Sequence, residues 1–227
     1  MLGNHSKLKL VFGEPVAFSS DYAIIGDLHL GFEEEMIKEG FNVYNQNNNI
    51  LKKIRQIKKE KLILLGDLRA EHGEIGVREA GFLLHAVSQI SSAFSHVVIT
   101  KGNHDGGLEK ITGRFKNVSL VKEFIDGGIG FLHGHALPSK ALVETCDTMC
   151  ISHLHPMVKV YDANNVMYKK DCWMLFDFKP SKKSESIRGI VVPKFNPYIG
   201  GTDNIKNAGI MSRASNIMRL TEDFVMV

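Results

Sequence analysis

Apolar and polar positions alternate in blocks along the first two-thirds of the chain and predict strands and helices in turn. Two segments, 50–60 and 77–94, repeat apolar residues every three or four positions with polar residues opposite, which is typical of amphipathic helices. Apolar runs of strand length begin at Tyr22, Lys61, His96, Ile129 and Thr148. Strands alternating with helices predict an α/β fold with strands buried on both faces.

The last third of the chain has a different pattern. Alternating apolar and polar residues surround the turn signal 162–165 and predict a β-hairpin, and "SIRGIVVPKF" predicts a further strand. Asn49 is expected to cap the first helix, and Pro138 to open a short third one. With 227 residues and no internal repeat, we expect one domain covering 1–227.

Composition narrows the class of protein but does not indicate a function. The chain is 44% hydrophobic and 23% charged, which is ordinary for a soluble globular protein. A net charge of +3 permits an anionic substrate, but no dominant Lys/Arg block indicates nucleic acid, which stays a possible partner only. The densest basic cluster, 52–61, has helical spacing and predicts a solvated helix face.

Three cysteines do not suggest a disulfide framework. We expect Cys146, Cys150 and Cys172 to be free and buried, as in a reducing compartment. Neither a signal peptide nor an apolar run long enough to span a membrane is evident, so a cytoplasmic location is expected. Whether the chain forms a homo-oligomer stays open.

Each of the five apolar runs ends in side chains that bind metal ions: Asp27 and His29, then Asp67, then Asn103, His104 and Asp105, then His133 and His135, then His153 and His155. In layered α/β proteins, the loops at the carboxyl ends of strands converge where ligands bind. Each piece alone has an ordinary explanation, since Gly-Asp and Asn-Asp groups also form turns. Their repeated place after a strand favours a metal site.

Carboxylate, imidazole and amide donors without thiolates favour divalent ions such as Mn, Fe or Zn over a structural cysteine-rich zinc site. The donors are too many for one ion. Two ions about 3.5–4 Å apart that share a carboxylate are an established solution for phosphoryl chemistry.

The motifs "GDLHLG", "LLGDL", "KGNHD", "LHGH" and "SHLHP" resemble the calcineurin-like metallophosphoesterase superfamily over roughly residues 24–156. "DLHLGFEEEM", the late "CW" and "FNPYIGG" further resemble a branch of small archaeal and bacterial phosphoesterases, some associated with DNA ligase. The resemblance implies a two-sheet β-sandwich flanked by helices, in four α/β/β/α layers. It also implies two divalent ions, with Mn favoured over Fe, Zn or Ni, bound by Asp27, His29, Asp67, Asn103, His133, His153 and His155.

In this resemblance Asp67 bridges both ions, and Asp27, His29 and His155 bind the first. His104 matches the position that contacts the phosphate and protonates the leaving group. His135 is not a family ligand and is expected to have a supporting or structural role.

The turn residues around His104 are less well defined by the resemblance. Asp105 is expected to cap its turn or to orient His104 rather than bind metal. Many members place Asp or His where this chain has Ala70, so Glu71 or His72 is a candidate substitute. Arg69 could contact a phosphate or pair at the surface.

The resulting hypothesis is hydrolysis of a phosphate ester, a diester rather than a monoester, by a bridging hydroxide that two metals make available near neutral pH. A nuclease acting on DNA or RNA is the alternative within the enzyme class. A non-catalytic scaffold is the alternative outside it, because one retromer subunit keeps this fold for protein interaction. The complete ligand set, together with His104, favours an enzyme.

Overall fold

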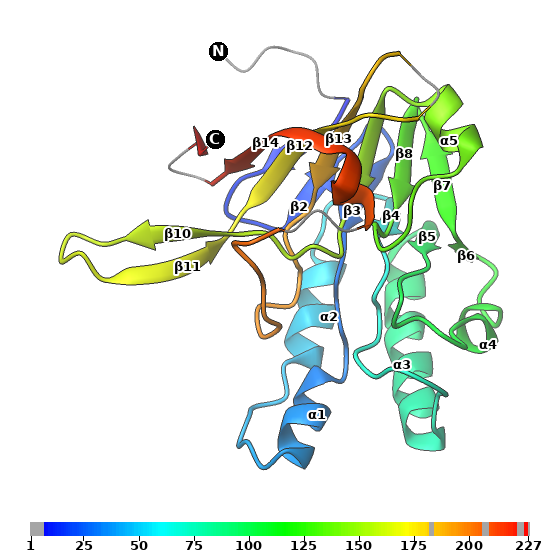
Figure 1. The fold of residues 1–227 in the computed structure, drawn as a ribbon. Helices are drawn as coiled ribbons and strands as arrows, with labels where there is room; N and C mark the ends of the chain where they lie inside the picture. The colour runs from blue at the N-terminus through cyan, green and yellow to red at the C-terminus, as the bar shows by residue number, and fades with distance from the viewer. Residues whose placement is uncertain (1–6, 182–183, 206–208, 222–224, 227) are drawn as a thin grey trace.

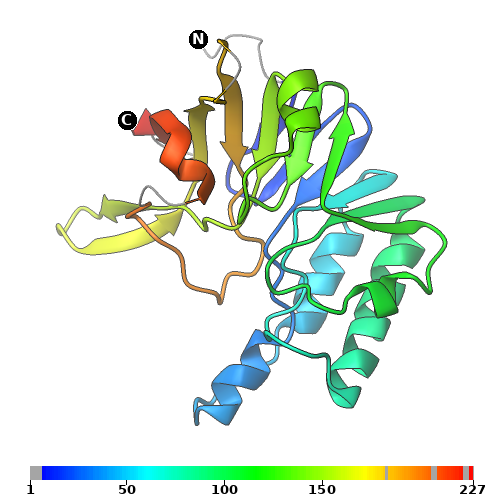
Figure 2. The ribbon, with the colours of Figure 1, turned by 45° about the vertical axis from the view of Figure 1, so that its right-hand side comes forward.

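The computed structural model describes residues 7–181, 184–205, 209–221 and 225–226. Two β-sheets pack face to face, and helices cover their outer faces (Figures 1 and 2). This arrangement confirms the predicted α/β fold of two packed sheets with flanking helices.

The first sheet has the strand order β1-β2-β3-β4-β5-β6. Strands β3 to β6 run parallel to one another, whereas β2 pairs antiparallel with both β1 and β3. The strands are β1 (Lys9–Val11), β2 (Val16–Phe18), β3 (Tyr22–Ile25), β4 (Lys61–Leu64), β5 (His96–Thr100) and β6 (Val118–Val121).

The second sheet has the order β15-β14-β12-β13-β9-β8-β7, with β8, β9 and β13 parallel. Its strands are β7 (Glu123–Asp126), β8 (Ile129–Leu132), β9 (Thr148–Ile151), β12 (Trp173–Phe178), β13 (Ile187–Val191), β14 (Ala214–Leu220) and β15 (Val225–Met226). The strands predicted from the five apolar runs are β3, β4, β5, β8 and β9.

Six helical segments connect these strands in the described residues. They are α1 (Phe32–Lys38), α2 (Asn47–Arg55), α3 (Val77–Ala93), α4 (Glu109–Thr112), α5 (Lys140–Thr145) and the 3₁₀ helix η1 (Gly209–Arg213). The prediction for α3 was correct to within one residue. The bounds predicted for two other helices were wrong. The first, α2, predicted over 50–60, follows Gln46 rather than Asn49 and ends at Arg55. The short helix α5 does not open at Pro138 but is capped by Ser139, whose hydroxyl accepts a hydrogen bond from the Leu142 amide.

Three apolar clusters fill the spaces between the layers because side chains alternate along each strand. In β3, Ala23 and Ile25 face α2 and α3, whereas Ile24 faces the second sheet. Phe176 packs in the third cluster, on the outer side of the second sheet. Both sheets are thereby fixed against each other, which aligns their strand ends.

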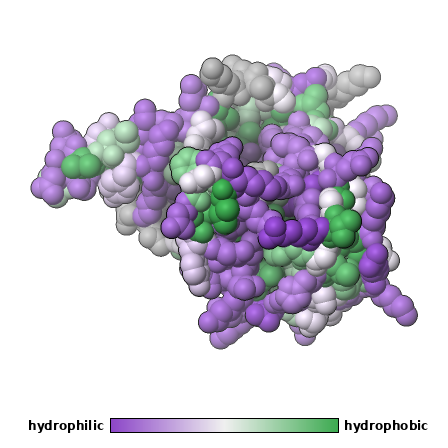
Figure 3. All heavy atoms as spheres, turned by 90° about the horizontal axis from the view of Figure 1, so that it is seen from below, coloured by the Kyte–Doolittle hydropathy of each residue, from purple (hydrophilic) through white to green (hydrophobic). Residues whose placement is uncertain are grey.

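A hairpin of β10 (Met157–Tyr161) and β11 (Met167–Asp171) projects from the body directly after the His155 loop (Figure 1). This confirms the predicted hairpin. From below, the surface is mostly hydrophilic, and the projecting hairpin carries small hydrophobic groups among polar ones (Figure 3). Tyr161 and Tyr168 are exposed there, on a hairpin that also carries Lys159 and Lys169.

Other features of composition can also be placed. Cys146, Cys150 and Cys172 are free thiols, and all three are buried. Within the part of the chain that the structure describes, no helix combines the length and the hydropathy that crossing a bilayer demands.

Candidate metal centre

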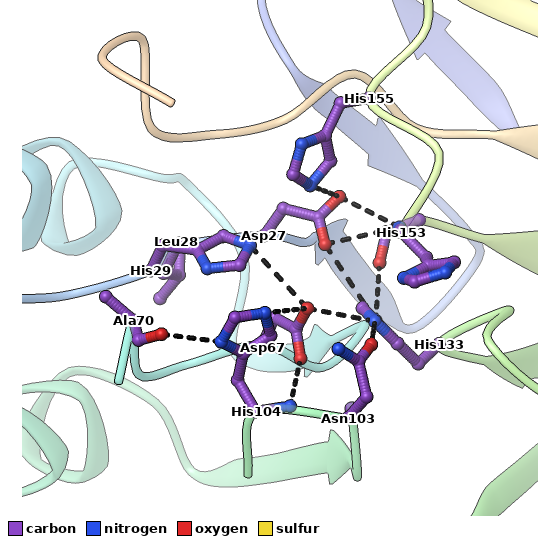
Figure 4. A network of polar contacts seen from close by, with 12 residues as sticks. Asp27, Leu28, His29, Asp67, Ala70, Asn103, His104, His133, His153 and His155 are labelled. Atoms are coloured by element: carbon purple, nitrogen blue, oxygen red, sulfur yellow. Dashed lines mark hydrogen bonds and ion pairs between the residues drawn. The ribbon is translucent and has the colours of Figure 1, made fainter. Parts of the chain in front are cut away.

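The predicted ligands meet where the two sheets adjoin (Figure 4). The loops after β3, β4 and β5 of the first sheet contribute carboxylates, an amide and two imidazoles. The loops after β8 and β9 of the second sheet contribute three imidazoles. Segments more than one hundred residues apart in sequence therefore share one site.

On one side of the site, Asp27, His29 and His155 offer ligand atoms within 4.8 Å of one another. His155 Nε2 lies 3.4 Å from Asp27 Oδ2, and His29 Nε2 lies 3.6 Å from Asp67 Oδ2. On the other side, Asp67, His133 and His153 form a second such group, and His29, Asp67 and His104 form a third.

The second group includes the predicted amide ligand. His133 Nε2 lies 3.1 Å from Asp67 Oδ2 and 3.2 Å from Asn103 Oδ1. Neighbouring ligand atoms about 2.0–2.2 Å from one tetrahedral or octahedral ion lie roughly 2.8–3.6 Å from each other. The spacing of these donors is therefore close to that of a coordination shell.

Two buried nitrogens support the same conclusion. Across residues 7–181, 184–205 and 209–221, neither His29 Nε2 nor His155 Nε2 finds a hydrogen-bond partner. A buried polar atom without a partner costs free energy, about 1–3 kcal/mol. His29 Nε2 faces the Asp67 carboxylate, and His155 Nε2 faces the Asp27 carboxylate. A divalent ion bound between a nitrogen and its carboxylate would give that nitrogen a partner, so the donor set fits a metal.

Backbone conformation distinguishes the ligands from the rest of the chain. Of the non-glycine residues with positive φ that the structure describes, five are predicted ligands: Asp27 (55°), His29 (39°), Asp67 (49°), His153 (68°) and His155 (41°). The others are two asparagines, a residue type that tolerates this region. Such backbone costs about 1–3 kcal/mol per residue and concentrates at functional sites.

Three imidazoles are oriented by backbone carbonyls through Nδ1. His133 Nδ1 donates to Leu65 O at 2.7 Å, and His155 Nδ1 donates to Gly200 O at 3.0 Å. His104 Nδ1 contacts Ala70 O in the same way. Each Nε2 therefore faces the carboxylates. In metal-binding histidines, a hydrogen bond from the other ring nitrogen commonly fixes the ring in this way.

Close packing explains why glycine precedes Asp67 and Asn103 at two of the strand ends. A Cβ on Gly66, whose φ is +76°, would lie 2.6 Å from His133 Nδ1. A Cβ on Gly102 would lie 2.1 Å from Asp67 Oδ1. The ligands pack against bare backbone at both places, so a side chain there would displace them.

Electrostatics in the site follow from burial and opposite charge. Burial disfavours charge on His133, but hydrogen bonding to Asp67 and the charge of Asp27 outweigh it and raise the pKa of His133 to about 9. Burial also acts to raise the pKa of Asp67, yet the hydrogen bond and charge of His133 hold that pKa well below its ordinary value. Burial lowers the pKa values of His29 and His153 to about 4. Burial also disfavours charge on His155, but its contact with Asp27 outweighs this and raises the pKa of His155. His29, His153 and Asp67 are thereby kept in the forms that bind metal, whereas His133 and His155 would lose a proton to do so.

Asp105 lies beneath the site and caps its turn, one of the two roles that the sequence predicts for it. Its fully buried carboxylate accepts hydrogen bonds from the amides of Asp67, Leu68 and Gly102, at 2.8–2.9 Å. Burial is the main cause of its raised pKa. Asp105 therefore joins the loops after β4 and β5 and is not among the residues grouped as possible metal ligands.

Arg69 does not lie at the surface as a pairing residue, because its side chain is completely buried. Its Nε and Nη2 donate to the Glu79 carboxylate at 2.6 and 2.8 Å. Its Nη1 donates to the carbonyls of Gly73, His104 and Gly106. With its donors engaged internally, Arg69 joins the His104 turn to the segment that follows β4.

His104 Nε2 lies 3.9 Å from Asp67 Oδ2, and its amide donates to Asp67 Oδ1 at 3.0 Å. This imidazole is held at Nδ1 by the Ala70 backbone carbonyl and not by the Glu71 or His72 side chain. The exposed His72 ring stacks on His104 with 3.6 Å between centroids, whereas Glu71 pairs with Lys38. His72, not Glu71, is the neighbour that contacts His104.

Two further residues complete the description. His135 is exposed, and its ring centroid lies 5.3 Å from that of His133, outside the ligand groups. Asn196 was not predicted as a site residue, although "FNPYIGG" was noted. It is fully buried, and its Nδ2 donates to Leu28 O at 3.0 Å, which supports the Asp27–His29 turn. An asparagine before proline signalled a turn but gave no partner.

Comparison with one solved structure supports the fold. The chain is similar to the crystal structure of Pseudomonas putida nuclease MPE, with a TM-score of 0.58, 16% identity, and 92% and 89% of the two chains covered. A single mutant of Vps29 from Entamoeba histolytica gives a TM-score of 0.38 at 12% identity, with 81% and 79% covered. No curated protein matches the sequence. Residues 21–199 match the calcineurin-like phosphoesterase family, and because this match spans most of the chain, the chain belongs to that family.

Proposed function

We propose that the chain is a phosphodiesterase with a dinuclear metal centre. The observation that carries this proposal is the position of Asp67. One of its carboxylate oxygens, Oδ2, faces His29 at 3.6 Å and His133 at 3.1 Å, and these belong to different ligand groups. A carboxylate between two sets of donors is the arrangement that bridges a pair of ions.

Two bound divalent ions would supply an acidified water and neutralise charge on the phosphate oxygens. The reaction is hydrolysis: water attacks phosphorus, the bond to the leaving oxygen breaks, and that oxygen takes up a proton. His104 suits this last step, since the Ala70 carbonyl fixes Nδ1 and directs Nε2 toward the site. We assign His104 as general acid and Mn as the favoured metal, with Fe, Zn or Ni able to replace it.

Hydrolysis of DNA or RNA is the second candidate. It is supported by the similar fold of a P. putida nuclease and by a lysine-lined cavity beside the centre. The single domain over 1–227, the cytoplasmic location and the possible homo-oligomer also stay proposals.

The test is release of p-nitrophenol from bis-p-nitrophenyl phosphate, with each metal added separately. Turnover is expected with Mn²⁺, and Asp67→Asn should reduce it on the order of a thousandfold or more, since metal stabilisation is worth several kcal/mol. Asp21→Asn is the matched control, because this exposed carboxylate lies at the opposite end of β3 from Asp27. Absence of turnover with Mn, Fe, Zn and Ni would favour a non-catalytic scaffold.

A further inference from the structure

A cavity of about 500 Å³ opens on the His133 side of the metal centre. Gly102 and His133 belong to both the cavity wall and the ligand loops. The remaining walls come from the segments that follow β5, β6 and β8. A substituent on a phosphate at the metal centre would therefore have space on this side.

The cavity carries positive charge close to the site. Lys101 and Lys122 line it from the ends of β5 and β6. Lys101 Nζ lies 3.3 Å from Glu109, whereas the exposed Lys122 has no ion pair or hydrogen bond within residues 7–181, 184–205 and 209–221. The acid in the lining, Glu123, accepts a hydrogen bond from the Ser139 amide at 2.7 Å. Lys122 is thus the cation available to an anionic group.

The other walls are apolar or aromatic. Leu132, Ala136 and Leu137 contribute apolar surface, and the Leu137 side chain is 46% exposed. His135, exposed at the rim, offers an imidazole face. A lysine ammonium can bind a phosphate, and an adjoining apolar wall can pack against a ring. A nucleotide combines these two groups.

We propose that this cavity binds the nucleotide next to the scissile diester, with Lys122 contacting the flanking phosphate. The inference rests on the proposed function and names its substrate class: a nucleic-acid strand in which a second phosphate accompanies the one that is cleaved. A flanking phosphate could also come from a diphosphate-linked compound, so the experiment separates the two sources.

The probes are the thymidine dinucleotide TpT, its 5′- and 3′-phosphorylated forms pTpT and TpTp, and the diphosphate-linked TppT. Cleavage between the nucleosides is followed by chromatography with Mn²⁺. One phosphorylated form should show a KM roughly five- to tenfold below that of TpT, as expected for one charged contact. Lys122→Ala should remove this advantage. Lys116→Ala should keep it, because Lys116 is exposed at the opposite end of β6.

Different outcomes overturn different claims. A lower KM for TppT alone would replace the strand with a diphosphate-linked substrate. Equal KM values for TpT, pTpT and TpTp, or an advantage that survives Lys122→Ala, would refute the cavity's role. In both cases, hydrolysis of bis-p-nitrophenyl phosphate would leave the proposed function standing. Failure to hydrolyse any diester would refute the proposed function and this inference together.

Discussion

The loops after β4 and β5 and the hairpin that follows His155 both adjoin the metal centre, but they are held in different ways. The first region relies on buried groups: Asp105 accepts three backbone hydrogen bonds, and Arg69 is completely enclosed. The second relies on ion pairs at the surface, where Lys159 and Lys169 contact Asp203 at 3.0 and 2.7 Å. Buried polar networks cost much more to disrupt than exposed pairs. Catalysis should therefore depend on the first region far more than on the second.

The largest effect should come from His104 in the buried region. His104→Asn is expected to lower kcat for bis-p-nitrophenyl phosphate by about 10²–10⁴-fold, the usual contribution of a general acid. Metal content, measured by plasma mass spectrometry, should stay at the wild-type level because the predicted ligands are untouched. Unchanged turnover would remove His104 from the mechanism.

Arg69→Met tests the support beneath that region. It leaves Glu79 without its partner and removes the donor to the Gly73 and Gly106 carbonyls, so the free energy of unfolding in urea should fall by about 3–5 kcal/mol. The control is Lys140→Met, whose pair with Glu144 is largely exposed and should be worth at most about 0.5 kcal/mol. Equal losses in the two variants would contradict the distinction between buried and exposed pairs.

Gly102→Ala tests the close packing of the ligands. The new Cβ would meet Asp67 Oδ1 at 2.1 Å, and displacing this carboxylate should weaken Mn²⁺ binding roughly 10- to 100-fold in calorimetric titrations. Gly106→Ala is the matched control, since its Cβ would meet nothing closer than the Gly73 carbonyl at 3.8 Å. Equal Mn²⁺ affinities for the two variants would show that metal binding does not depend on the present position of the Asp67 carboxylate.

The smallest effect should come from the hairpin region. Asp203→Asn breaks contacts to Lys159 and Lys169 but leaves every predicted ligand in place. Turnover of bis-p-nitrophenyl phosphate and metal content are expected to stay within about twofold of the wild type. A loss as large as that of His104→Asn would mean that the hairpin controls the centre.

The sequence predicted the fold and the meeting of the candidate ligand side chains because both follow from local rules. Buried strands produce continuous apolar runs, and parallel strands bring their carboxyl ends to one edge. The predicted start of α2 was wrong because the helix follows Gln46, which makes no side-chain cap hydrogen bond and so gives no capping signal in the sequence.

Contacts set by tertiary structure could not be predicted in this way. The burial of Arg69 depends on Glu79 in α3, and the hold on His104 depends on the Ala70 backbone carbonyl, which no side-chain pattern records. Asn196 supports a turn 168 residues away. The cavity near Lys122 likewise forms only when β6 and β8 are brought together.

The most direct test of the central claim is anomalous X-ray diffraction from crystals of the Mn²⁺-loaded protein. The account predicts two manganese peaks about 3.5–4 Å apart, with the Asp67 carboxylate in contact with both. A single ion, or ions that lie away from Asp67, would contradict it.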